Sequence, residues 1–228
     1  MKTRLIVSII AAMAIMSVSV DASAQAADKE TRKEVAKHEK VLKQEMRKRA
    51  IKEARKEAKR LAKEGFNVPI GQMPMDKQLE NSWQAAYEID ENGFPYYIIS
   101  TQKSVAGNYS AAQMQAMNAA KIDIAGQIQT MVNQVIETKV ASNELQKGEA
   151  ASLNSFVSSS KNIISNSMGR VIKLVEVYRT LKNGNTEVMV TVAYNSDLAT
   201  TEAIKAMRES LTAESVEVMQ QLDKLVTK

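Results

Sequence analysis

The sequence contains no cysteine among its 228 residues. The chain therefore forms no disulfide bond, offers no thiolate to a metal ion or a substrate, and cannot be lipidated on a cysteine. Histidine is nearly as scarce, because the single histidine, His38, lies in a highly charged segment where a solvated side chain is expected. That scarcity argues against a histidine-cluster metal site and against a serine–histidine–aspartate triad. We therefore expect no catalytic, cofactor-binding or metal-binding residues, no cofactor and no enzymatic activity.

Aromatic residues, glycine and proline are also rare. Aromatics make up 4% of the chain, with eight glycines and three prolines. Residues that interrupt helices are thus few, and so are the aromatic residues typical of strands. The composition predicts a mainly helical protein with a small β component.

A long hydrophobic run occurs only at the N-terminus. The basic start Met1–Arg4 is followed by the apolar stretch Leu5–Val20 and then by small residues in an Ala-x-Ala pattern. This order is that of a secretory signal peptide, and the apolar stretch is shorter than the roughly 20 residues of a membrane-spanning helix. We predict a signal peptide at 1–26, cleaved after Ala24 or Ala26, with an uncleaved amphipathic anchor as the alternative. The mature protein is then expected to be exported, periplasmic or outer-membrane-associated, and without a transmembrane helix.

The segment from Asp28 to Glu64 carries most of the positive charge. It holds 15 Lys/Arg against 8 Asp/Glu, a net charge of +7, whereas the chain from Gly65 onward has a net charge of −3. The segment has no glycine or proline, and glutamates repeatedly stand three or four residues before a lysine or arginine. It therefore predicts a long helix at 27–64. Its apolar side is too thin and too rich in alanine to sustain a stable coiled coil.

Three interpretations of this charged helix are open. In the first, it is a solvated helix of which one side packs on the domain. In the second, it attaches the protein to an anionic surface such as phospholipid, lipopolysaccharide or cell-wall polymer. Nucleic acid is the least favoured partner, because an export signal is present and eight acidic residues interrupt the basic patch. The residues expected to contact an anionic surface are Arg47, Lys48, Arg49, Lys52, Arg55, Lys56, Lys59, Arg60 and Lys63.

A linker at 65–75 separates the charged helix from the folded domain at 76–228. Asp76 is expected to cap a short helix. Trp83 of that helix, the only tryptophan, is interpreted as a core residue, with a ligand platform as the less favoured alternative. The linker is recognised by four residues that stop a helix or prevent one from starting, Gly65, Pro69, Gly71 and Pro74.

The most regular stretch of the domain, Ser110 to Val140, predicts one amphipathic helix. Ser110 and Gln113 fit a capping box at its start. We interpret it as a core helix whose small residues let it lie close against a sheet, and a methionine-lined ligand groove is the alternative. Its inward stripe is expected at Met114, Met117, Ile124, Ile128, Met131 and Val135, widened by Ala120, Ala125, Val132 and Ile136.

Strand and turn signals flank this helix. The strongest hairpin signal of the chain is Asn183-Gly184, between two β-branched stretches. The elements predicted besides the long helix are strands at 95–105, 170–181 and 186–194, a serine-rich helix at 152–169, and a last helix at 198–226 with a break near Thr212.

These elements predict an α+β fold. A small, mostly antiparallel sheet of about three strands is covered by two long helices, mostly on one face, and is preceded by the long charged helix. Such a sheet leaves strand edges unpaired, so a homo-oligomer formed through an edge or through the exposed face is one expected arrangement.

Four features of residues 83–199 carry a resemblance to a known family. They are the region of Trp83, the strand Tyr96–Ile99, the alanine-rich helix Ala116–Ile128 and the strand end Val190–Tyr194. Together they resemble small exported proteins of Gram-negative bacteria, the outer-membrane lipoproteins that include flagellar-sheath antigens and are related to the N-terminal domain of a flagellar assembly protein. The resemblance implies an exported envelope protein without catalytic residues. This chain differs from the family in having no cysteine for lipidation and in carrying a charged helix before the domain.

These observations predict a non-enzymatic, envelope-associated binding or structural protein whose basic helix holds it near an anionic surface. Its partner is then an envelope protein or an anionic envelope polymer or lipid. The alternative is a periplasmic carrier of a small ligand in a methionine-lined pocket between helix and sheet. An enzyme that uses carboxylates alone is the third hypothesis, but Asp123, Glu137 and Glu176 have no partner at a recognisable spacing.

Overall fold

The computed structural model describes three stretches of the chain, 24–90, 93–211 and 216–226. By its internal contacts the chain divides into two compact units, Met1–Met46 and Arg47–Lys228.

Helix α1 (Ala24–Lys63) is the only element that the structure describes in the first unit, and it continues into the second. The prediction of a long helix in the charged segment is confirmed. The predicted signal peptide lies outside the described residues except for Ala24–Ala26, and the side chain of His38 lies outside them too. Among the helices that the structure describes, none is long and apolar enough to cross a membrane.

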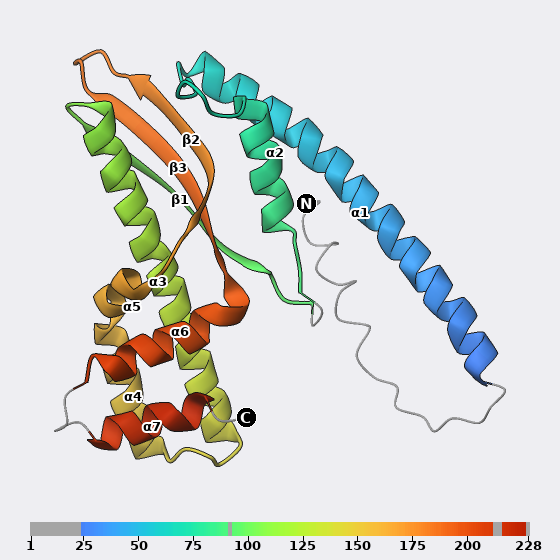
Figure 1. Ribbon diagram of the computed structural model, residues 1–228, viewed down its shortest axis with the longest axis vertical. Coiled ribbons are helices and arrows are strands. Elements are labelled where there is room, and N and C mark those ends of the chain that lie inside the picture. The colour runs from blue at the N-terminus through green and yellow to red at the C-terminus, as the bar shows by residue number, and fades with distance from the viewer. Residues whose placement is uncertain (1–23, 91–92, 212–215, 227–228) are drawn as a thin grey trace, which may run out of the picture. The chain divides into compact units, whose positions relative to one another are not determined.

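The second unit is an α+β domain, as predicted (Figure 1). After α1 its elements are α2 (Met75–Ala86), β1 (Tyr97–Ala106), α3 (Tyr109–Ala141), α4 (Lys147–Ser159), α5 (Lys161–Ser167), β2 (Ile172–Thr180), β3 (Thr186–Asn195), α6 (Ser196–Glu209) and α7 (Val216–Val226).

The three strands form one antiparallel sheet in the order β1-β3-β2. The predicted hairpin between β2 and β3 is confirmed, and Gly184 takes the positive φ of +83° that its turn requires. Seven consecutive residues of the central strand, Val188–Tyr194, are buried. Alternate residues of a strand point to opposite faces, so this continuous burial means that both faces of the sheet are covered at β3.

Helix α3 covers the first face, but with a different inward stripe from the one predicted. Its buried residues are Ala112, Ala116, Ala120, Ile124, Ala125, Ile128, Val132 and Ile136. The placement of Met114 on that stripe is wrong, since its side chain is 62% exposed, while Met117 and Met131 are only partly buried at the margin. Alanine at steps of four brings the helix backbone close to the sheet, where a methionine would not fit.

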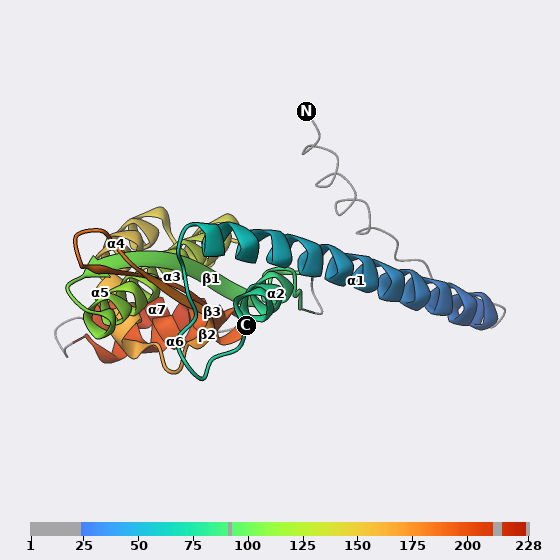
Figure 2. The ribbon, with the colours of Figure 1, turned by 90° about the horizontal axis from the view of Figure 1, so that it is seen from above.

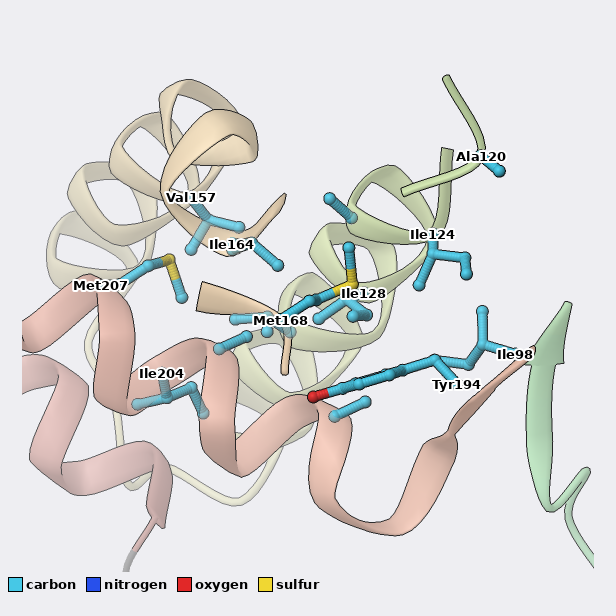
Figure 3. Close-up of a cluster of buried hydrophobic side chains, with 14 of the residues drawn as sticks. Ile98, Ala120, Ile124, Ile128, Val157, Ile164, Met168, Tyr194, Ile204 and Met207 are labelled. Atoms are coloured by element: carbon cyan, nitrogen blue, oxygen red, sulfur yellow. The ribbon is translucent and has the colours of Figure 1, made fainter. Parts of the chain in front are cut away.

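The rest of this core comes from the C-terminal helices. Figure 3 shows Ile128 of α3 next to Met168 and Ile124 on the side of Ile98 and Tyr194, and Ile204 of α6 belongs to the same cluster. The single serine-rich helix of the prediction is two helices, α4 and α5, separated at Ser160, whose buried hydroxyl donates to the carbonyl of Phe156 at 2.7 Å. The predicted break in the last helix falls between α6 and α7, and Thr212 itself lies outside the described residues.

Two predicted helix caps are wrong. Helix α3 begins at Tyr109 and its cap is Asn108, whose side chain accepts from the amide of Ala111 at 2.9 Å. The extended backbone of Asn108, with φ of −150°, is the conformation an N-cap needs. Ser110 therefore lies inside the first turn of α3. Helix α2 begins at Met75, after Pro74, so Asp76 lies in the first turn rather than at the cap.

The second face of the sheet is covered by α2, the segment 64–74 and the part of α1 that belongs to this unit (Figure 1, Figure 2). Helices thus lie on both faces, but α3 to α7 all contribute to the core on the first face, in agreement with the prediction that they lie mostly on one. Phe66, inside the expected linker, is 2% exposed. The second hydrophobic cluster consists of Ala54, Leu61, Phe66, Leu79, Val175, Val177 and Met189.

The segment after α1 also covers the outer edge of β2. Asn67 and Tyr178 exchange two backbone hydrogen bonds, of 2.7 and 2.9 Å. The side chain of Gln78 accepts from the amide of Glu176 at 2.7 Å. These contacts satisfy backbone groups that an edge strand would otherwise leave unpaired. Both β1 and β2 are edge strands of the described sheet, and the outer edge of β2 is covered at these positions.

Glu176 connects this covering segment to the sheet and to α3. Its side chain is fully buried and forms an ion pair with Lys173. The same carboxylate accepts from the hydroxyl of Tyr109, from Gln113 Nε2 at 2.7 Å and from Gln72 Nε2 at 2.9 Å. Burial by itself would raise the pKa of Glu176, but the hydrogen bonds from Lys173, Tyr109 and Gln72 outweigh it and lower that pKa. The buried group is therefore a carboxylate at neutral pH.

Removing this carboxylate should destabilise the fold. Glu176→Ala leaves several buried donors without an acceptor, so we expect a loss of about 3 kcal/mol in the free energy of unfolding. Glu176→Gln keeps an acceptor and should lose less. Urea unfolding measures both, and Glu209→Gln on an exposed site should change stability by about 0.5 kcal/mol or less. An equal, small effect of all three substitutions would contradict the role of Glu176.

The lowered pKa of Glu176 also predicts the sign of a pH dependence. A carboxylate with a lower pKa in the folded state stabilises the protein above its ordinary pKa, and that contribution disappears as the pH falls through the folded-state value. The difference in unfolding free energy between the unsubstituted protein and Glu176→Gln should therefore be constant near neutral pH and shrink below about pH 4. Urea titrations at several pH values between 7 and 3 measure it, and a difference that grows on acidification would contradict the prediction.

Candidate functional site

The positive charge of the chain is concentrated in the part of α1 that belongs to the second unit. Residues 47–63 contain nine Lys/Arg and two Glu, a net charge of +7, whereas residues 28–46 have a net charge of only +1. All nine basic residues predicted to contact an anionic surface fall in this stretch. They are exposed in the structure, and we call them the cationic ridge: Arg47, Lys48, Arg49, Lys52, Arg55, Lys56, Lys59, Arg60 and Lys63.

A narrow line of small residues holds the ridge on the domain. Ala50, Ala54 and Leu61 are buried, at 4%, 0% and 0% exposure, and Ala58 packs partly buried beside them. With 3.6 residues per turn these positions lie along one side of the helix. Eight of the nine cations, all except Arg47, then fall within an arc of roughly 140° opposite that side. The domain thus orients the cations outward, as in the interpretation of a helix that rests one stripe on the domain.

Few of these cations are neutralised within the helix. Lys56 lies 4.0 Å from Glu53, and Arg60 Nε donates to Glu57 at 2.9 Å while its guanidinium also pairs with Glu64. The hydrogen bond from Arg60 is the main reason why the pKa of Glu57 is lowered, and it raises the pKa of Arg60 in turn. For the other seven ridge residues, the described side chains include no ion-pair partner. Exposed pairs of this kind contribute little to stability, so the ridge is chiefly a region of positive potential.

The C-terminal end of α1 is fixed by Arg179 of β2. Arg179 Nη1 donates to the carbonyl of Glu64 at 3.0 Å, and Arg179 Nε pairs with Glu187 at 2.6 Å. Its guanidinium also lies over the ring of Phe66, 4.6 Å from the centroid. A cation at the carboxyl end of a helix stabilises the helix dipole. Helix α1 ends at Lys63, and Gly65 follows with a φ of +88°, which confirms the predicted stop.

A groove lies between α1 and α2, and four residues of the ridge line it. Its volume is about 590 Å³, and it is open to solvent. Trp83 of α2, half-buried against the second hydrophobic cluster, stacks on Tyr87 with ring centroids 5.9 Å apart. Trp83 thus packs against the core, as predicted, and also borders an open groove, where the less favoured interpretation as a ligand platform would place it. The groove is lined by Glu53, Lys56, Glu57, Lys59, Arg60, Lys63 and Trp83.

The carboxylates considered for an enzyme are not brought together. Asp123 and Glu137 are fourteen residues apart on α3, about 21 Å along the axis. Asp123 accepts from Gln127 at 3.1 Å, and Glu176 is buried among its own partners. In the part of the chain that the structure describes, no group of three or more His, Asp or Glu residues is placed to hold a metal ion.

The interior of the domain offers no support for the methionine-lined carrier. The stripe of α3 that faces the sheet consists of alanine, isoleucine and valine, at 0–1% exposure. Met114 points to solvent, and the other two methionines of the predicted stripe lie at the margin of the core.

Comparison with known proteins adds no relative, since no protein-family model, no curated protein and no solved structure matches this chain. The resemblance to exported lipoproteins therefore stays a prediction.

The packing of α1 on the sheet can be tested by a single truncation. Leu61→Ala removes a fully buried side chain from the contact of α1 with the sheet, so we expect a loss of about 2–5 kcal/mol in unfolding free energy. Urea unfolding followed by the emission of Trp83 measures it. Leu198→Ala is the matched control, because Leu198 is 58% exposed and its truncation should change stability by about 0.5 kcal/mol or less. Equal effects of the two truncations would mean that α1 is not packed.

Proposed function

We propose that this protein is a non-enzymatic, exported module that attaches to an anionic surface of the cell envelope through the cationic ridge. The observation that carries the proposal is the placement of nine exposed cations on a helix whose opposite side is packed on a sheet. On a helix that did not pack on the domain, the charges would have no fixed direction relative to the domain. The packed helix presents them together toward one partner surface, which raises the local concentration of an anionic ligand.

The charge of the remaining chain supports the same conclusion. From Gly65 onward the net charge is −3, so the ridge differs in sign from the rest of the protein. An anionic surface is therefore attracted to one region and repelled by others, which orients the protein on contact. Attachment of this kind is electrostatic and is weakened when salt screens the charges.

The export signal and the family resemblance give the proposed compartment. The basic start, apolar stretch and Ala-x-Ala pattern favour secretion. The exported lipoproteins that residues 83–199 resemble are held by a lipid on cysteine, and this chain contains no cysteine. In our proposal the cationic ridge performs the attachment.

Neutralising part of the ridge should release the protein from anionic vesicles. Replacing Lys48, Lys52 and Lys59 by glutamine removes three exposed cations, each worth about 1 kcal/mol near an anionic bilayer. We expect the partition coefficient to fall about a hundredfold. Co-sedimentation with phosphatidylglycerol-containing vesicles, at low and high salt, measures it, and isolated cell wall serves as a second anionic surface.

The matched control replaces three exposed lysines elsewhere, Lys147, Lys182 and Lys205, and changes the net charge by the same amount. It should reduce binding far less. Equal losses for the two triple variants, or retention that does not depend on salt, would contradict attachment through the ridge. Point variants are preferable to deletion of α1, because deletion would expose the apolar residues that Leu61 covers.

A further inference from the structure

The groove between α1 and α2 differs from the rest of the ridge in its chemistry. Away from the groove the ridge is cationic only, and a phosphate-rich surface would suit it. Inside the groove two carboxylates, Glu53 and Glu57, stand among the cations, and Trp83 supplies an aromatic surface. A site for phosphate alone gains nothing from carboxylates or from an indole. The combination points to a ligand that carries hydroxyl groups and an apolar face as well as negative charge.

We infer that this groove binds an anionic saccharide, in which sugar rings pack against Trp83, hydroxyls donate to Glu53 and Glu57, and phosphate or carboxylate groups pair with Lys59 and Lys63. The inference rests on the proposed function. It identifies the anionic partner, at this site, as a saccharide.

Each part of the groove matches one property of such a ligand. The C–H face of a pyranose ring is apolar and packs against an aromatic ring, and Trp83 is held in place by its stacking on Tyr87. A carboxylate accepts two hydroxyl donors, which makes charge-assisted hydrogen bonds. Lys59 and Lys63 have no ion-pair partner among the described side chains, so they are available to an anionic substituent.

The size and openness of the groove fit the same ligand. A volume of about 590 Å³ is within the range of roughly 300–1,000 Å³ that ligand sites occupy. The site is partly open to solvent, so a saccharide larger than the groove can extend beyond it. Glu53 and Glu57 have side chains that are 45% and 37% exposed, which leaves their oxygens accessible.

The two carboxylates also distinguish a saccharide from a phospholipid surface. A carboxylate repels the phosphates of a lipid bilayer and accepts hydrogen bonds from sugar hydroxyls. Removing Glu53 should therefore change the two affinities in opposite directions. Glu53 is the better test residue, because Glu57 also holds Arg60 in place.

The test is a fluorescence titration of Trp83, the only tryptophan, in the purified full chain at physiological salt. The probes are trigalacturonate, a phosphorylated glucosamine disaccharide, a neutral trisaccharide, inorganic phosphate and phosphatidylglycerol vesicles. The first carries its negative charge on carboxylates and the second carries it on phosphate. We expect one or both to shift the emission of Trp83 and to bind at least about tenfold more tightly than the neutral trisaccharide and inorganic phosphate.

Three variants separate the groove from the ridge. Lys63→Gln should weaken the binding of both the saccharide and the vesicles, whereas Lys52→Gln, on the ridge but outside the groove, should weaken only the binding of vesicles. Glu53→Ala should weaken saccharide binding about tenfold or more and strengthen vesicle binding. Calorimetry with Trp83→Ala, which should lose saccharide binding, and with Trp83→Phe, which should retain most of it, gives a readout independent of fluorescence.

The possible outcomes separate the two proposals. If vesicles bind in a ridge-dependent manner but no anionic saccharide binds, the groove inference is overturned and the proposed function stands. If Lys52→Gln lowers saccharide affinity as much as Lys63→Gln does, binding is only a general effect of charge, and the inference is overturned as well. If neither vesicles, cell wall nor saccharides bind, both proposals fail.

Discussion

The buried carboxylate of Glu176 is the interaction on which the arrangement of this domain depends. A carboxylate is expensive to remove from water unless its charge is paired and its oxygens are hydrogen-bonded. Here Lys173 supplies the charge, and Tyr109, Gln113 and Gln72 supply the donors. These partners come from β2, from the start of α3 and from the segment after α1, three parts of the chain that no local interaction brings together. Gln72 belongs to the segment that covers the edge of β2. One segment therefore supplies a hydrogen bond to the carboxylate and hydrogen bonds to the backbone of the edge strand.

The segment after α1 holds the C-terminal end of that helix on the domain. It thereby determines the direction in which the cationic ridge faces. The contact is narrow, because α1 offers only alanines and Leu61 to the sheet. A narrow contact leaves most of the helix surface to charged residues, and it leaves that surface in one orientation. A broader apolar face would have buried some of the positions that now carry cations. In α3 alanine lets the helix backbone lie close against the sheet, whereas in α1 it keeps the contact with the second hydrophobic cluster narrow.

The secondary structure could be predicted largely from local signals. The charged helix, the three strands, the Asn183-Gly184 turn and the stop at Gly65 all follow from propensity and turn chemistry within a few residues. The errors have physical causes that involve partners distant in the sequence. Gln113 was assigned to a capping box and instead donates to Glu176, and Met114 was placed inward where the sheet leaves room only for alanine. Among the site residues, the exposure of the ridge followed from its charge, but the groove at Trp83 did not.

By itself, the sequence determined the class of fold, the location of the positive charge in one helix, and the absence of cysteine. These are properties of composition and of neighbours along the chain. Only the tertiary structure decided that residues 47–63 belong to the compact domain, that Glu176 is buried among four partners, and that Trp83 faces Glu53 and Lys63 across a groove. The reason is that these contacts, apart from that of Lys173 with Glu176, join residues twenty to more than a hundred positions apart. Their formation depends on how helices and sheet share apolar surface, which no local pattern encodes.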